Sequence, residues 1–235
     1  MQPNDGRDTL VFSRGGGPYG NALPNAAGGN AFAPGYCGGA YTSPAPGNCR
    51  LDRNRPDYSV KVGLDSRSGA FVAGVLVEGQ INRSQDYTSG FSDTPNAYQI
   101  TRGLDYGVSL RGRLGFSPDH GGGRMYVTGG VGYARMRHQF LTTNTVNQFT
   151  TNNDNSWVLG GQLGGGAEVM MTPHVGLGIE YLYNHFRDKK YYVTAGQGTA
   201  GATNPFILGG TTTNIKDSNP NYNFHTVRAV LAYHF

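Results

Sequence analysis

Apolar and polar residues alternate along the last twelve positions of the chain, from Phe224 to Phe235. One face is mostly apolar and ends on two aromatic residues, Tyr233 and Phe235, whereas the opposite face is mixed and carries Arg228. A period of two predicts a β-strand with one apolar face. We expect this strand to cross a membrane, with its apolar face toward lipid and its polar face toward the lumen of a barrel.

The same alternation predicts six further strands upstream, at about residues 58–64, 70–81, 106–116, 124–137, 156–171 and 175–186. Short connections near residues 65, 120 and 172 alternate with long ones near residues 35, 95, 148 and 205. This layout is typical of an outer-membrane barrel with short periplasmic turns and long extracellular loops. The predicted fold is therefore all-β: one transmembrane antiparallel up-and-down β-barrel domain of eight strands over residues 1–235.

An even strand count requires one more strand near the beginning of the chain. Residues 8–14 are one candidate, and residues 15–56, rich in Gly and Pro, would then form a long first loop. Alternatively, the first strand lies at about residues 35–42 and everything before it is a flexible N-terminal tail.

The alternation also places charged side chains on the inward face of the strands. A lipid-facing Arg or Lys near mid-membrane costs about 2–4 kcal/mol, so a one-residue slip that exposed Arg111 and Arg113 would be strongly unfavourable. An eight-stranded barrel is just wide enough for side chains, so we expect the inward charges to pair and fill the lumen rather than line an ion path, with Glu180 as partner of Arg228. The predicted lumen network consists of Lys61, Glu78, Arg111, Arg113, Glu168, Glu180 and Arg228.

Beyond the apolar stretches, the outward positions reach six basic residues at the loop ends of the strands. Guanidinium groups are well suited to phosphate, so one hypothesis is that this rim binds lipopolysaccharide phosphates in the outer leaflet. The alternative is that the long side chains only extend toward the polar interface. The rim consists of Arg83, Arg102, Arg135, Arg137, Arg187 and Lys189.

Composition agrees with a narrow barrel ringed by aromatic residues: the chain of 235 residues has 38 Gly and 15 Tyr, and only 14% of its residues are charged. The net charge of +4 is not gathered into long basic runs, which argues against nucleic-acid binding. The six histidines form no ligand motif, and we expect neither a metal site nor a cofactor. Cys37 and Cys49 do not have a metal-ligand spacing, so we predict a loop disulfide formed in an oxidising compartment, with unpaired thiols as the alternative. The first residues lack the features of a secretion signal, so we expect Met1 to replace a removed one or the chain to be processed.

Four segments resemble the small eight-stranded outer-membrane barrels of Gram-negative bacteria, of the OmpA-like and opacity-protein type. They are Tyr126-Val-Thr-Gly-Gly-Val-Gly-Tyr-Ala134, Gly164-Gly-Gly-Ala-Glu168, Gly178-Ile-Glu-Tyr-Leu-Tyr183 and the end from His225 to Phe235. The resemblance covers about residues 58–235. It implies a non-enzymatic, surface-exposed protein of the outer membrane, assembled by the barrel assembly machinery through a C-terminal signal that includes Tyr233 and Phe235. Family roles include envelope integrity, adhesion and interaction with small solutes or haem.

Together these observations predict a structural or surface-interaction protein in contact with outer-membrane lipid and lipopolysaccharide. Its lumen is filled by side chains, and its extracellular loops bind a ligand or a surface partner. The alternative within the same class is a narrow porin or an uptake barrel for small solutes or haem. We predict no catalytic residues, because a filled lumen offers no cleft for a substrate. A soluble β-sandwich lectin or enzyme is the alternative outside this class.

Overall fold

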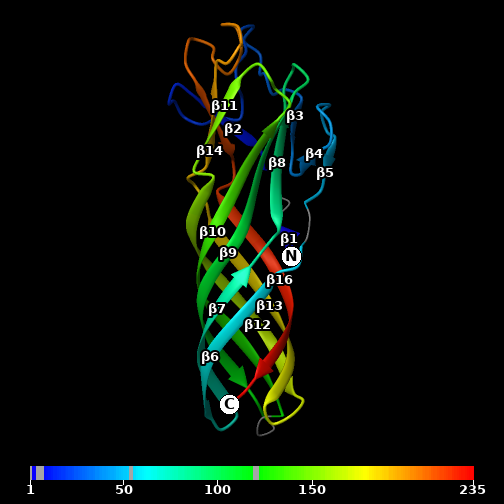
Figure 1. The fold of residues 1–235 in the computed structure, drawn as a ribbon, viewed down its shortest axis with the longest axis vertical. Coiled ribbons are helices and arrows are strands. Elements are labelled where there is room, and N and C mark those ends of the chain that lie inside the picture. Colours follow the sequence, from blue (N-terminus) through cyan, green and yellow to red (C-terminus); the bar gives the residue numbers. More distant parts are fainter. Residues whose placement is uncertain (1, 4–7, 53–54, 119–121) are drawn as a thin grey trace.

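The computed structural model describes residues 2–3, 8–52, 55–118 and 122–235, which form one long cylinder with its strands inclined to the long axis (Figure 1). No helix in these residues is long and apolar enough to cross a membrane. The strands are β1 (Gln2–Pro3), β2 (Leu10–Arg14), β3 (Gly35–Cys37), β4 (Ala40–Tyr41), β5 (Cys49–Arg50), β6 (Tyr58–Ser68), β7 (Phe71–Ile81), β8 (Gln85–Phe91), β9 (Ala97–Phe116), β10 (Gly123–Thr142), β11 (Gln148–Asn152), β12 (Asn155–Met170), β13 (Val175–Arg187), β14 (Tyr192–Gly196), β15 (Thr213–Asp217) and β16 (Asn221–Tyr233).

Seven long antiparallel strands form the wall of the cylinder, in the order β16-β13-β12-β10-β9-β7-β6. Strands β9 and β10 have 20 residues each. At about 3.3 Å per residue they are roughly twice as long as the apolar thickness of a bilayer. Their upper halves therefore continue out of the membrane, and the sequence prediction for both strands was too short.

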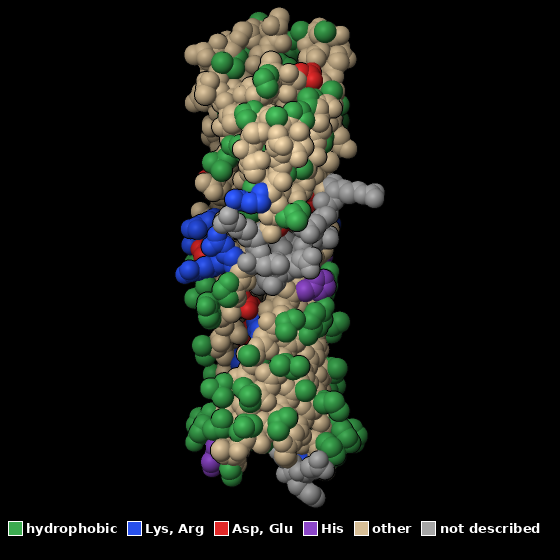
Figure 2. Space-filling model, turned by 90° about the vertical axis from the view of Figure 1, so that its right-hand side faces the viewer, with side chains coloured by type: hydrophobic (Ala, Val, Ile, Leu, Met, Phe, Trp, Pro, Cys, Tyr) green, Lys and Arg blue, Asp and Glu red, His purple; other side chains and the backbone are tan. Residues whose placement is uncertain are grey.

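In the lower half of the wall, apolar side chains cover the outside. Outward residues such as Leu110 and Val127 are 55% and 62% exposed, and Figure 2 shows hydrophobic side chains over much of this half. Tyr106, Tyr133 and Trp157 mark the upper limit of the apolar band, and we call them the girdle. The Trp157 ring stacks on Tyr133 at 4.9 Å and meets the edge of Tyr106 at 5.7 Å.

The periplasmic connections are short, as predicted, but the first lies further along the chain. Strand β6 continues to Ser68, which pairs with Phe71, so the turn is Gly69-Ala70 rather than residues 65–69. Gly69 has a φ of +60°, which favours glycine at this position of a two-residue hairpin. The turn after Phe116 contains residues 119–121, which lie outside the described residues.

Neither predicted first strand crosses the membrane. Strand β2, within residues 8–14, pairs with β15, and β3, within residues 35–42, pairs with β8 above the apolar band. Both segments alternate too briefly to reveal where they lie. In the barrel wall, β1 pairs with β16 through Gln2↔His225, and among the described residues β6 and β16 do not pair with each other.

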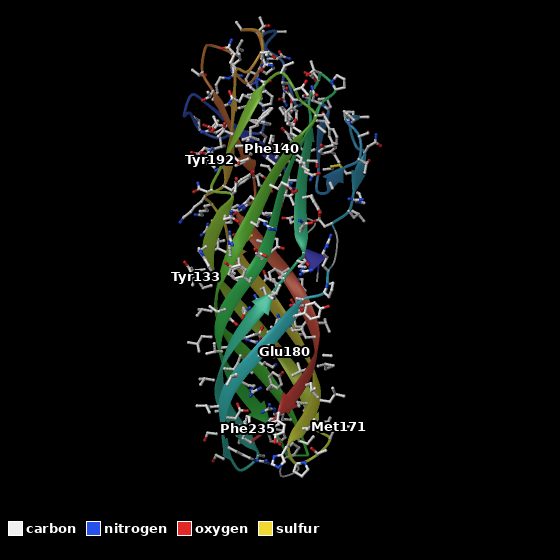
Figure 3. All side chains as sticks on the ribbon, in the orientation of Figure 1. Tyr133, Phe140, Met171, Glu180, Tyr192 and Phe235 are labelled. Carbon is white, nitrogen blue, oxygen red and sulfur yellow. A yellow bond between two sulfur atoms is a disulfide. The ribbon has the colours of Figure 1, made fainter. Side chains whose placement is uncertain are left out.

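Above the girdle the protein forms a compact part that we call the head. Long connections that the sequence predicted as loops contain β11, β14 and β15, which join β2 in a second antiparallel sheet. The core of the head is a cluster of buried apolar side chains that includes Phe12, Phe32, Tyr98, Val193 and Ile215. In Figure 3, Phe140 and Tyr192 lie in this upper part, whereas Met171 and Phe235 lie at the opposite end. The disulfide Cys37–Cys49, with Cα atoms 6.6 Å apart, is present in the head as predicted.

One irregularity in β9 separates the two parts. Opposite β10, the register shifts between Ala134 and Met136, so β9 has one extra residue there. Below the shift the even-numbered residues of β9 face lipid, as Tyr106 does, but above it the even-numbered residues such as Leu104 are buried. A β-bulge of this kind reverses which residues face inward.

Candidate functional site

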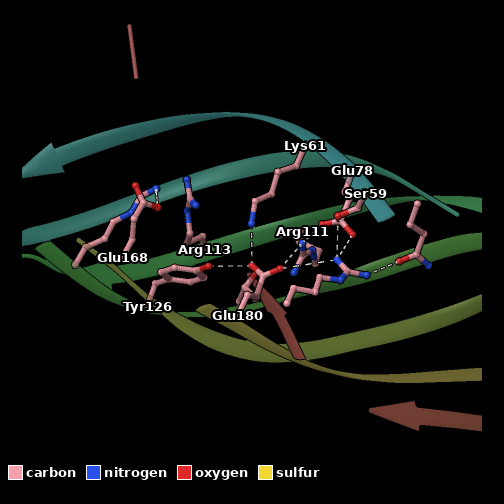
Figure 4. A network of polar contacts seen from close by, with 12 residues as sticks. Ser59, Lys61, Glu78, Arg111, Arg113, Tyr126, Glu168 and Glu180 are labelled. Atoms are coloured by element: carbon pink, nitrogen blue, oxygen red, sulfur yellow. Dashed lines mark hydrogen bonds and ion pairs between the residues drawn. The ribbon is translucent and has the colours of Figure 1, made fainter. Parts of the chain in front are cut away.

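The lower lumen contains a buried network of charged side chains centred on Glu180 (Figure 4). Glu180 accepts a hydrogen bond from Tyr126 at 3.0 Å, pairs with Lys61 at 3.2 Å, and lies 3.4 Å from Arg111. Arg111 also pairs with Glu78, and both side chains are fully buried. Each buried charge of this group therefore has at least one opposite partner, as burial requires.

Arg228 enters the same network across the lumen, but Glu180 is not its main partner. Its guanidinium lies 2.5 Å from Glu78 and 2.8 Å from Asp57, and 3.9 Å from Glu180. Arg228 and Glu180 are direct neighbours in the β13–β16 register, but the long Arg side chain extends past this neighbour toward β6 and β7. Asp57 was not predicted because it precedes the alternating stretch.

A second charged group lies nearer the periplasmic end. Asp65 pairs with Arg113 at 2.5 Å and with Arg124 at 2.6 Å, and Arg124 also pairs with Glu168 at 2.9 Å. His234 lies 2.6 Å from Glu168. All seven residues predicted to face the lumen thus lie in one of these two groups. Asp65 was missed because it was assigned to a turn, although its position in the alternation points inward, as does that of Arg124.

An apolar layer fills the barrel above the charged groups. Its seven buried residues come from five strands of the wall: Leu104, Ala134, Met136, Val158, Phe186, Tyr222 and Phe224. The Phe186 and Phe224 rings stack at 6.1 Å, and Tyr222 lies 5.4 Å from Phe224. Going upward, the interior therefore changes from charged to apolar.

Arg102 does not belong to the outward rim, contrary to the prediction. It is 4% exposed and lies inside the barrel, 2.5 Å from Asp86 and 3.1 Å from Asp8. The bulge in β9 is the reason, because it reverses the direction of the residues above it. Burial and the neighbouring carboxylate of Asp217 raise the pKa of Asp8 to about 6, and burial also raises the pKa of Asp217. We call these four residues the upper charge cluster.

The other five rim residues lie toward the outside. Arg83, Arg137, Arg187 and Lys189 are exposed. Arg135 is half-buried, with its guanidinium 5.7 Å from the centre of the Tyr106 ring and 3.2 Å from the Tyr106 hydroxyl. None of the five forms an ion pair within the described part of the chain.

The head has a pocket of its own, which the sequence did not predict. Its volume is 690 Å³, and the buried rings of Phe32, Tyr98 and Phe206 line it together with the amides of Asn144 and Asn204. Tyr98 and Phe206 lie 5.4 Å apart, and Asn144 donates a hydrogen bond to the Tyr98 hydroxyl at 2.9 Å. The pocket thus combines an aromatic wall with polar side chains. We call it the head pocket.

The two residues predicted to act as an assembly signal lie at the periplasmic end. The rings of Tyr233 and Phe235 contact each other edge to face at 4.9 Å, and both are exposed. Tyr233 also stacks on His174 of the β12–β13 connection at 5.9 Å.

Comparison with known proteins identifies the family to which this architecture belongs. The chain matches the family described as outer membrane protein beta-barrel domain over residues 20–235. No curated protein matches it. Among solved structures, the outer membrane protein OprG from Pseudomonas aeruginosa is similar at 11% identity and a TM-score of 0.29, with 97% of this chain and 92% of that chain covered. The family match confirms the resemblance seen in the sequence and the expected location: the chain belongs to the outer membrane protein beta-barrel domain family and is a protein of the outer membrane.

Proposed function

We propose that this protein is a non-conducting binding protein of the outer membrane, in which a filled barrel holds a ligand-binding head above the membrane. The observation that carries the proposal is the succession of two fillings in the lumen. Arg111, Glu78 and Glu180 fill it with paired charges, and the apolar layer fills it again higher up.

Each filling opposes ion passage in a different way. A hydrated ion would have to separate buried ion pairs, and breaking such a pair costs about 3–5 kcal/mol. It would then have to enter an apolar constriction, which excludes water. Planar-bilayer recordings on the purified protein test this part of the proposal. We expect no steady channels, and reproducible unitary conductance would instead support the narrow-porin alternative.

The head pocket supports the binding role. Its 690 Å³ lies within the range of about 300–1,000 Å³ that small-molecule sites occupy. The aromatic rings and amides that line it favour a small ligand with an apolar or aromatic body and a hydrogen-bonding edge.

Ligand-detected NMR with a panel of small aromatic and aliphatic compounds tests the pocket. Thr203→Trp serves as a variant with a blocked pocket. Thr203 lies exposed among the lining residues, and a larger side chain there would occupy the pocket. We expect some compounds to bind the wild type and to lose binding in the variant. The binding role is contradicted if no compound binds the wild type, or if binding persists unchanged in Thr203→Trp.

We also propose that the wall closes as an eight-stranded barrel. Among the described residues, the facing edges of β6 and β16 are unpaired below Gln2↔His225, and unpaired backbone groups in the bilayer cost several kcal/mol each. Strands β6 and β16 run in the same direction, so an eighth strand between them would run antiparallel to both, and β1 pairs with β16 at the upper end of this gap. Arg228 already spans this gap to reach Asp57 and Ser59.

Cysteine cross-linking in the outer membrane tests the closure. Val60→Cys with Val227→Cys places thiols on the two facing edges, and Val62→Cys with Val77→Cys places them on residues paired across β6 and β7. A disulfide requires Cα atoms within about 7 Å, so we expect the control pair to cross-link and the edge pair to remain free. Efficient cross-linking of the edge pair would show that β6 and β16 meet directly, in a barrel of seven strands.

A further inference from the structure

A hollow interrupts the barrel wall where β8, β9 and β10 pass from the apolar band into the head. It measures 740 Å³, and we call it the wall groove. Strand β7 ends at Ile81 and β8 begins at Gln85, opposite the bulge of β9. In register, Gly103 lies between Gln85 of β8 and Arg137 of β10, so no side chain fills the wall at this point.

Three arginines that have no carboxylate partner among the described residues line the wall groove. Arg55, Arg83 and Arg137 are all exposed, and none of them forms an ion pair with any residue that the structure describes. By contrast, the arginines of the lumen, such as Arg111 and Arg228, are all paired. Guanidinium groups left unpaired around one hollow are available to an anion from outside, and their fork of N–H donors matches phosphate.

The wall groove also offers hydrogen-bonding groups other than arginine. Asp105 and Asp154 line it, and their carboxylates can accept hydrogen bonds from hydroxyl or amino groups. Asn82 and Ser84, which line it too, are buried, and within the described part of the chain the Asn82 amide nitrogen and the Ser84 hydroxyl have no hydrogen-bond partner. Such a mixture fits a sugar phosphate better than a bare anion.

The height of the wall groove identifies the source of such a ligand. It lies directly above the girdle, where Arg135 contacts the Tyr106 ring at 5.7 Å. Figure 2 shows Lys and Arg side chains gathered at mid-height, between the apolar lower half and the upper half of the molecule. In an outer-membrane protein this is the level of the lipid head groups in the outer leaflet.

We propose that the wall groove binds the phosphorylated sugar head of lipopolysaccharide. Arg83 and Arg137 hold a phosphate from the two sides of Gly103, Arg55 adds a third positive charge, and Asp105 accepts hydrogen bonds from the sugar. Phosphate binding is thereby assigned to one hollow rather than to all basic residues of the rim. This site is independent of the ligand of the head pocket.

The experiment compares two double charge reversals on the same rim. Arg83→Glu with Arg137→Glu alters the wall groove. Arg187→Glu with Lys189→Glu makes the same change in net charge outside it. Both proteins and the wild type are refolded free of lipopolysaccharide, checked by heat-modifiable gel mobility, and titrated with lipopolysaccharide vesicles. We expect the groove variant to bind at least about tenfold more weakly and the control to stay within about twofold of wild type, since each charge-assisted contact contributes strongly to affinity.

Two further arms distinguish the possible sources of the phosphate. Dephosphorylated lipopolysaccharide should bind the wild type as weakly as intact lipopolysaccharide binds the groove variant. Inorganic phosphate at the same phosphate concentration should not displace lipopolysaccharide from the wild type. If the groove variant cannot be folded, Arg83→Gln with Arg137→Gln takes its place, with Arg187→Gln and Lys189→Gln as control.

Four results would overturn the proposal. Equal losses in both charge reversals would indicate diffuse attraction by the whole rim. Wild-type affinity in the groove variant would show that these arginines do not bind the ligand. Undiminished binding of dephosphorylated lipopolysaccharide would exclude phosphate recognition, and displacement by inorganic phosphate would indicate a site for free phosphate rather than for the glycolipid.

Discussion

Below the girdle the barrel has apolar side chains outside and charged side chains inside, whereas above it the head is built around an apolar core. Leu110 faces lipid while Arg111, the next residue, is fully buried among carboxylates. In the head, Phe32 and Ile215 are buried, and the exposed surface in Figure 2 is largely polar but carries few charges. The same strands, β9 and β10, run through both regions.

The contrast follows from the surroundings of each region. The outward side chains of the barrel are compatible with lipid, and those of the head are compatible with water. Lipid accepts apolar residues, so the narrow lumen must hold the polar ones, and there charges are tolerated only in pairs. Water accepts the polar surface of the head, which leaves apolar residues to form a core. Four substitutions test how far the two regions follow opposite rules.

The largest effect is expected from Glu180→Leu in the lumen. The change leaves Lys61 without its partner and removes one of two partners of Arg111, and an uncompensated buried charge costs about 3–5 kcal/mol. Urea unfolding of the folded barrel in lipid vesicles measures the loss. Glu180→Gln keeps a hydrogen-bond acceptor for Tyr126, so it should lower the free energy of unfolding by less than Glu180→Leu does. Equal stability of wild type and Glu180→Leu would show that the charged network does not stabilise the barrel.

Phe32→Ala tests the head, where the rule is reversed. Phe32 packs against Phe12 at 4.4 Å, Tyr98 at 5.1 Å and Phe206 at 6.0 Å, and loss of a buried Phe side chain costs about 3–5 kcal/mol. We expect proteases to cleave the head while the barrel keeps its heat-modifiable gel mobility. Simultaneous loss of both would indicate that head and barrel fold as one unit.

Leu110→Arg compares the two outer surfaces. A lipid-facing Arg near mid-membrane costs about 2–4 kcal/mol. The same residue at Thr150, on the partly exposed β11 of the head, faces water and should cost almost nothing. Urea unfolding in vesicles and protease resistance of the head measure the two effects. A large loss from Thr150→Arg would mean that the surface of the head is covered, for example by a partner.

The smallest effect concerns the upper charge cluster and pH. The pKa of Asp8 rises from 3.8 to about 6 on folding, so the folded head holds this proton more tightly than the unfolded chain. The stabilisation is complete below pH 3.8 and is lost as pH rises through about 6. We expect amide hydrogen exchange in β2 to become faster over this interval, and Asp8→Asn to make exchange less dependent on pH. A wild type whose exchange, corrected for its intrinsic pH dependence, is constant from pH 4 to 7 would contradict the shift.

The sequence predicted the membrane half well because one solvent acts on each face of a strand there. Strict alternation at residues 71–81 and 106–116 fixes the register and hence the inward direction of Glu78 and Arg111. Above the girdle, residues 97–102 of β9 are buried on both faces, so no alternation remains to be recognised. No feature of the sequence marks the extra residue in β9. The alternation of inward and outward residues was extended past it, which gave the wrong direction for Arg102. The head pocket and the wall groove escaped prediction because their walls come from segments far apart in the chain.

The bulge in β9 has a consequence for how the family can diversify. The bulge shifts which residues of the strand face inward. A change of chain length above it can therefore alter the upper register without changing the register below, which the bilayer fixes. Removal of one residue at Asp105 or Tyr106 would turn the upper part of β9 inside out and leave the membrane part unchanged. The membrane half can therefore keep its register while the length and the side chains of the part above the bulge change.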